Sequence, residues 1–125
     1  AFGQDDFPAF WSRISGLAAP LRMDAAGQIA ASALMRARLG LPGGQLVANP
    51  IPVEAEIASD ILAPIIAQAQ SEADAQGIVG KSVTPFLLQR IFELTEGQSL
   101  EANIALVLNN ARLAAAIARA LVTQD

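Results

Sequence analysis

The sequence predicts an α/β fold in which helices dominate and strands are few and short. Four stretches have helical apolar spacing between residues that favour helix ends, whereas two or three short apolar runs are typical of strands. Those strands are too few to form a stable sheet alone. The chain is also 53% hydrophobic, above the roughly 45–50% usual for soluble domains, which indicates contact with further protein. Residues 1–125 are therefore interpreted as one segment of a larger α/β domain.

The N-terminal half is expected to alternate short strands with one helix. The aromatic segment 7–11 is interpreted as a short buried turn, and the alternative is an aromatic wall, including Phe7, for a planar ligand. Asp24 is the expected N-cap of a helix over residues 25–39, which Gly40 ends. The expected strands or strand ends are residues 1–3, 17–22 and 45–48.

A stiff loop follows the third expected strand. In Asn49-Pro50-Ile51-Pro52, two prolines fix φ and remove two N–H donors, so the segment is expected to be extended and rigid. A rigid loop between a strand and a helix is where α/β proteins place ligand sites.

The next helical stretch, residues 54–76, is expected to form two pieces. Ser59 or Asp60 caps the second piece, so that Pro64 falls near its first turn, where a missing N–H matters little. Gly77 is expected to end it.

Two more helices are expected towards the C-terminus. Residues 80–83 are expected to form a loop, after which Thr84 as N-cap and Pro85 as first residue open a helix to about residue 94. Ser99 is the expected cap of a final helix that extends to about residue 122.

An asparagine pair, Asn109 and Asn110, interrupts the apolar pattern of this final helix. Asparagine disfavours helix interiors, and a buried amide without a partner costs about 1–3 kcal/mol. At roughly 100° per residue, Asn110 shares a stripe with Asn103, whereas Arg112 and Arg119 mark the expected solvent face. Asn110 should therefore point to the interior or a cleft, with Asn109 on the flank nearer the arginines. The pair is either structural, bonded to neighbouring backbone, or bound to a ligand.

Several kinds of site are excluded or disfavoured by composition. Without cysteine or histidine, the chain has no disulfides, thiolate metal sites or histidine-dependent catalytic triads. Its basic residues are scattered, which disfavours nucleic-acid binding, and no uninterrupted apolar run reaches the roughly 18–20 residues of a membrane helix. No signal peptide is visible, which favours a cytoplasmic protein. Lys81 is the only candidate lysine nucleophile or phosphate ligand, although a loop lysine is more often a solvated charge.

A series of motifs resembles the C-terminal part of pseudouridine-5′-phosphate glycosidases, which are also described as indigoidine synthase A-like proteins. In chain order they are DDFPAFW, SGL, GLPGGQLVANPIP, QGIVGKSVTPFLL, ELT and SLEANIALVLNNARLAAAIA, and together they cover nearly the whole chain. Two departures are visible: Gln4-Asp5-Asp6-Phe7 replaces Thr-Asp-Glu-Phe, and Ile14-Ser15-Gly16 replaces Ser-Ser-Gly. The resemblance implies a three-layer α/β/α fold, of which this chain is a mostly helical part with few strands.

The resemblance also implies a reaction, the reversible cleavage of pseudouridine 5′-phosphate to uracil and ribose 5-phosphate. In the family a lysine attacks the sugar C1, an acidic residue moves protons, and Mn²⁺ helps to bind the phosphate. These groups precede the DDFPAF motif, so the chain is expected to be inactive alone and to act with the rest of the parent chain in a homotrimer. The implied substrate-binding residues are Asn110, in the LNNA motif, and with weaker support Asn109, Lys81, Asn49 and Phe7.

Two alternatives stay open at this point. The chain is a non-catalytic helical oligomerisation module, which would account for its apolar excess, or part of an enzyme on the same scaffold with another substrate, such as one serving pigment biosynthesis.

Overall fold

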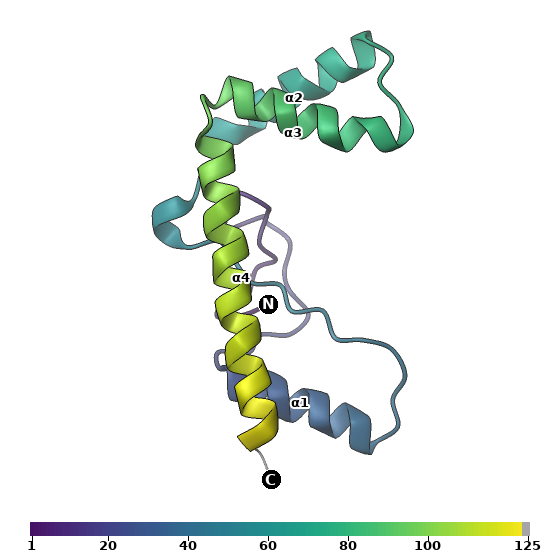
Figure 1. Cartoon of the computed structure of the whole chain (residues 1–125), viewed down its shortest axis with the longest axis vertical. Coiled ribbons are helices and arrows are strands. Elements are labelled where there is room, and N and C mark those ends of the chain that lie inside the picture. Colours follow the sequence, from purple (N-terminus) through teal and green to yellow (C-terminus); the bar gives the residue numbers. More distant parts are fainter. Residues whose placement is uncertain (124–125) are drawn as a thin grey trace.

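The computed structural model describes residues 1–123, and within them it contains four α-helices. They are α1 (Ala26–Arg38), α2 (Ser59–Ala75), α3 (Val83–Leu94) and α4 (Gln98–Thr123), with 3₁₀ turns at Val53–Ala55 and Gly80–Ser82. The long α4 runs along the longest axis of the molecule, with the α2/α3 hairpin beside its start and α1 beside its end (Figure 1). The prediction of a mostly helical chain is confirmed.

The three expected strands do not form within the described residues, and that expectation is wrong. The extended segments touch only through isolated bridges, Phe2 with Met23 and Asp6 with Ala18. The Phe2 N–H also donates to the Ala48 carbonyl at 2.9 Å. Leu46 is 86% exposed, so residues 45–48 are not a buried strand either. Each segment lacks the continuous ladder of a neighbour that a strand requires.

Helix ends that depend on glycine are confirmed. Gly40 and Gly77 follow α1 and α2 with φ of 63° and 65°, the left-handed region that glycine adopts without strain. The Leu41 N–H then donates back to Arg36 and the Ile78 N–H to Ala73, the pattern expected when glycine ends a helix.

The first predicted N-cap is displaced by one residue. The cap of α1 is Ala25, and the Gln28 side chain accepts hydrogen bonds from the N–H groups of Asp24 (2.8 Å) and Ala25 (3.2 Å). The Asp24 carboxylate instead pairs with Arg22 at 2.8 Å. An ion pair therefore competes for the side chain that was expected to cap the helix.

The later helix starts also differ from the predictions. α3 begins at Val83, directly after a 3₁₀ turn, so Thr84 and Pro85 are its second and third residues. Ser99 is the second residue of α4. Residues 54–58 contribute only a 3₁₀ turn, and Pro64 is the sixth residue of a single helix α2. It therefore lies just beyond the first turn.

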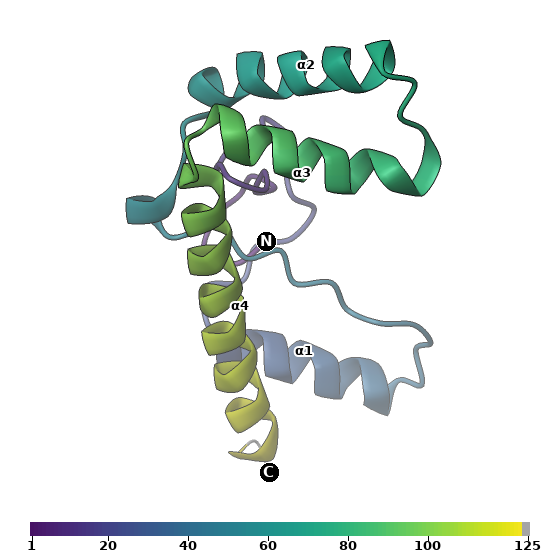
Figure 2. The ribbon, with the colours of Figure 1, turned by 45° about the horizontal axis from the view of Figure 1, so that its top comes forward.

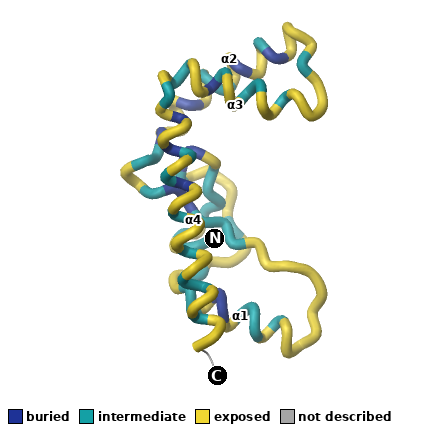
Figure 3. The backbone as a smooth tube through the Cα atoms, viewed as in Figure 1, coloured by how far each residue is buried: buried dark blue, intermediate teal, exposed yellow. Residues whose placement is uncertain are grey.

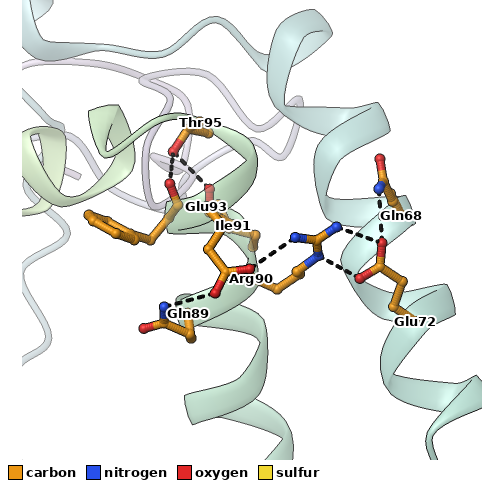
Figure 4. Close-up of polar contacts among 8 residues, drawn as sticks. Gln68, Glu72, Gln89, Arg90, Ile91, Glu93 and Thr95 are labelled. Atoms are coloured by element: carbon orange, nitrogen blue, oxygen red, sulfur yellow. Dashed lines mark hydrogen bonds and ion pairs between the residues drawn. The ribbon is translucent and has the colours of Figure 1, made fainter.

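An ion-pair network joins α2 to α3. Arg90 donates to both oxygens of Glu72, with Nε–Oε2 at 2.5 Å and Nη2–Oε1 at 3.1 Å, and to Glu93 at 2.9 Å (Figure 4). The hydrogen bond from Arg90, followed by that from Gln68, holds the pKa of Glu72 below its ordinary range. This network ties together the two helices that lie side by side in Figure 2.

The core lies where the start of α4, the base of the hairpin and two loops meet (Figure 3). Its buried members are Trp11, Ile51, Ile57, Leu62, Ala69, Ile91, Ala102 and Leu106. Of the predicted buried aromatic turn, Trp11 is buried, whereas Phe10 is half exposed and Phe7 half-buried. The Trp11 indole N–H donates to the Ser99 carbonyl at 2.9 Å, which ties residues 7–11 to α4.

The side of α4 away from this core is also apolar. Leu100, Ile104, Val107 and Leu108 are about half exposed. By length and composition alone α4 is able to cross a membrane, although a core helix of a soluble protein meets the same criterion. Arg112 and Arg119 lie exposed on this helix, as expected from their spacing.

Candidate functional site

The asparagine pair of α4 meets the proline-rich loop through two hydrogen bonds. Asn109 Nδ2 donates to the Pro50 carbonyl at 3.0 Å, and Asn49 Nδ2 donates to Asn110 Oδ1 at 3.0 Å. The structure thus brings Asn49, Asn109 and Asn110 together across about 60 residues of sequence. We call these three residues and Pro50 the asparagine site.

The two asparagines of α4 differ in burial, and the more buried of the two is Asn109. Asn109 is half-buried and Asn110 is exposed at the rim of a groove. Asn109 follows the buried Ala102 and Leu106 at helical spacing, so it lies towards the inward face. It also lies nearer the arginines than Asn110 does, as expected, because it borders the same hollow as Arg112. Asn110 therefore faces a cleft, one of the two surroundings expected for it, whereas the inward position of Asn109 was not foreseen because the arginines alone were used to orient the helix.

The side-chain pair formed by Asn49 and Asn110 has one amide nitrogen and one carbonyl oxygen that its own hydrogen bond does not use. Within the described residues, no partner is found for Asn110 Nδ2 or for Asn49 Oδ1. One amide donor group and one carbonyl acceptor are therefore left on adjacent, linked side chains. Such a pair can bind a ligand group that itself carries a donor and an acceptor side by side.

The asparagine site separates two depressions. The Asn110 groove, of about 440 Å³, is mostly apolar and is lined by Gln45, Val47, Asn49, Asn110, Leu113, Ala114, Ile117, Ala118 and Leu121. The Arg13 hollow, of about 390 Å³, is lined by Phe2, Gly3, Arg13, Asn49, Pro50, Asn109, Arg112 and Leu113. Asn49 borders both, and among residues 1–123 no carboxylate lines either one.

Arg13 lies beside the asparagine site, and it was not identified from the sequence. Its Nη1 donates to the Ile51 carbonyl at 2.5 Å, next to the carbonyl that Asn109 holds. Arg112, which was interpreted only as a marker of the solvent face, also borders the hollow. The available signal was indirect, because a loop with two prolines has few donors of its own and its buried carbonyls need donors from elsewhere.

Two predicted site residues lie away from the asparagine site. Lys81 is exposed in the 3₁₀ turn that joins α2 to α3, at the end of the hairpin distant from α4 (Figure 1). Phe7 lines a separate pocket of about 230 Å³ with Leu21, Met23 and Ile29. The structure does not bring either residue to the asparagines.

The described residues do not offer a metal centre, since nowhere among them do three acidic side chains gather as a metal ion would need. Asp5 is paired with Arg22 at 2.9 Å, and Asp6 Oδ1 accepts hydrogen bonds from Ser15 and Gly16. The described residues that line the two depressions beside the asparagine site include no carboxylate but do include the guanidinium groups of Arg13 and Arg112, whose positive charge disfavours a divalent cation.

Known proteins resemble this chain throughout its length. The family model described as indigoidine synthase A like protein matches residues 1–120. A relative from Jannaschia sp. (strain CCS1), named pseudouridine-5′-phosphate glycosidase, is 71% identical over 123 residues, which cover 98% of this chain and 41% of the relative. One of the same name from Paracoccus denitrificans is 72% identical, with 98% and 40% covered. The chain thus spans about two fifths of the length of these relatives.

Solved structures share the fold. The prealnumycin C-glycosynthase AlnA, in complex with ribulose 5-phosphate, superposes with a TM-score of 0.85 at 29% identity, over 96% of this chain and 39% of that one. An indigoidine synthase A-like protein from Thermotoga maritima gives a TM-score of 0.81 at 35% identity, over 94% and 38%.

Proposed function

The chain belongs to the family of indigoidine synthase A-like proteins, and on this premise we propose that it forms part of a pseudouridine-5′-phosphate glycosidase. The protein would cleave the C–C bond between base and sugar, giving uracil and ribose 5-phosphate. The high identity to relatives that carry this name supports the proposal. So does the solved structure of a C-glycosynthase bound to a sugar phosphate, since it has the same fold.

The observation that carries the proposal is the Asn49–Asn110 pair with its unused donor and acceptor. A uracil ring presents carbonyl acceptors next to an N–H donor, which this pair complements. A C-glycoside has no leaving-group oxygen to protonate, so holding the base in the correct orientation gains importance over simple acid catalysis. Asn110 would bind a carbonyl or hydroxyl of the substrate, and its helix would support the pocket.

The bond-breaking groups are proposed to lie outside this chain. Lys81 is distant from the asparagine site, and the described residues do not fit a metal. The nucleophilic lysine and the Mn²⁺ ligand would therefore come from the remaining part of the family enzyme. The homotrimer is proposed from the family resemblance, and the cytoplasmic location from the lack of a visible signal peptide.

A chimera tests this proposal. This chain would replace the matching 123-residue stretch of the Paracoccus denitrificans relative, and uracil release from pseudouridine 5′-phosphate would be measured with MnCl₂. We expect activity in the chimera, none in the chain alone, and a marked loss of turnover in Asn110→Ala without loss of folding. A folded chimera that releases no uracil would count against the proposal.

The solved C-glycosynthase favours one alternative, an enzyme of this scaffold that joins a sugar phosphate to another acceptor. A panel of C-nucleoside and aromatic substrates given to the same chimera distinguishes the two. Preference for an aromatic acceptor over pseudouridine 5′-phosphate would select the alternative.

A further inference from the structure

We propose that Arg13 is a positioning residue, which fixes the loop of residues 49–52 so that Asn49 holds Asn110 at the rim of its groove. Nothing in the Arg13 side chain needs to touch the substrate for this role. The kinetic consequence rests on the proposed function, whereas the positioning itself is a property of this chain.

The loop depends on donors from other elements. Its two prolines have no N–H, and Ile51 between them is fully buried, so water cannot readily satisfy the carbonyls on that side. Three carbonyls in or beside the loop are each held by a different part of the chain. The bonds are Phe2 N–H to Ala48 (2.9 Å), Asn109 Nδ2 to Pro50 (3.0 Å) and Arg13 Nη1 to Ile51 (2.5 Å).

Arg13 is itself held by neighbours on both sides. Its backbone N–H donates to Glu56 Oε1 at 2.7 Å, and its carbonyl accepts from Gln4 Nε2, also at 2.7 Å. Its Nη2 donates to Gln4 Oε1 at 3.4 Å. The guanidinium therefore links the N-terminal segment to the loop and forms no ion pair with a carboxylate among the described residues.

The geometry suits arginine better than lysine. Two nitrogens of one planar group reach two acceptors, the Ile51 carbonyl and the Gln4 side chain. A lysine ammonium is a compact charge on a flexible side chain. It can replace one of these two hydrogen bonds, but it does not hold both acceptors in a fixed geometry. The loop would keep a partner and lose part of its orientation.

The test compares Arg13→Met and Arg13→Lys with a matched control, Arg36→Met. Arg36 also donates from its guanidinium to a loop carbonyl, that of Pro42 at 3.0 Å, but this carbonyl lies earlier in the connection after α1 and outside residues 49–52. Each variant is made in this chain, where NMR records the side-chain amide resonances of Asn49 and Asn110. Each is also made in the Paracoccus denitrificans chimera, where KM and kcat for uracil release are measured separately.

For Arg13→Met we expect shifted Asn49 and Asn110 amide resonances and a KM raised at least tenfold, with kcat changed less. Arg13→Lys should recover part of the KM, and Arg36→Met should match the unmodified chimera. Unmoved resonances, or a KM equal to that of Arg36→Met, would overturn the proposal, even if the melting temperature fell. If the unmodified chimera released no uracil, the proposed function would be rejected. The NMR comparison would still test whether Arg13 positions Asn49 and Asn110.

Discussion

The two asparagines of α4 should contribute unequally to stability. Asn109→Ala removes the donor to the Pro50 carbonyl, and Pro50 is buried, so the loss is about 1–3 kcal/mol. Alanine is the better helix former by roughly 0.5 kcal/mol, which offsets part of that loss. The net expectation is about 0.5–2.5 kcal/mol of lost stability, or a melting temperature lower by about 2–10 °C.

For Asn110→Ala the same arithmetic gives a net change in stability near zero. Its bond to Asn49 joins side chains at an exposed rim and is worth about 0.5 kcal/mol or less, which the gain in helix propensity cancels. Asn103→Ala is the control for propensity alone, because no hydrogen bond of the Asn103 side chain is found in the described part of the chain. The Asn103→Ala variant should leave the free energy of unfolding unchanged or raise it slightly.

Urea unfolding of the chain, followed by circular dichroism at 222 nm, measures all three variants. The reasoning is refuted if Asn110→Ala loses as much stability as Asn109→Ala, or if Asn109→Ala behaves like Asn103→Ala. The first result would mean that the exposed bond between Asn49 and Asn110 contributes as much as the bond to Pro50, and the second that the bond to Pro50 contributes nothing to the folded state.

Three further variants test the core and the hairpin. Ile51→Ala should lower the free energy of unfolding by about 2–5 kcal/mol in urea titrations, since the side chain is fully buried. Trp11→Phe keeps a ring but removes the N–H bond to Ser99, and calorimetry should record a loss of about 1–3 kcal/mol. The pKa of Glu72 is lowered by its bond to Arg90, so this pair stabilises the fold above the ordinary carboxyl pKa and less as the pH falls through the lowered one. Glu72→Gln should therefore melt earlier than the unmodified chain at pH 7, and the difference in melting temperature should begin to shrink only below about pH 4, as the pH falls towards the lowered pKa of Glu72.

Local chemistry accounts for the parts of the fold that could be predicted. Gly40 and Gly77 end their helices because a single residue with positive φ suffices, and no distant partner takes part. The N-cap at Asp24 failed because Arg22 takes its carboxylate. The strand prediction at residues 45–48 failed because strands need neighbours, and the described chain supplies one hydrogen bond there from Phe2.

The candidate site was predicted in part for the same reason. Asn109 and Asn110 were recognisable because polar amides stood out in an apolar helix, whereas Asn49 was named from the family resemblance. Arg13 was not recognisable, because nothing near it in the sequence indicates that its partner is the Ile51 carbonyl. The distance of Lys81 from the site likewise depends on how the α2/α3 hairpin packs, which no local pattern specifies.

The structural and functional interpretations of the asparagine pair were posed as alternatives, but the geometry divides them between the two residues. Neighbours in a helix point about 100° apart, so Asn109 and Asn110 cannot share one environment. Asn109 faces inward and bonds to a backbone carbonyl, as a structural asparagine does. Asn110 lies at the rim and bonds to a side chain that leaves its amide nitrogen unused. The first asparagine therefore fixes the loop that carries Asn49, and only then can the second present a donor in a defined direction. A substitution at either position should impair ligand binding, but only the one at Asn109 should also destabilise the fold.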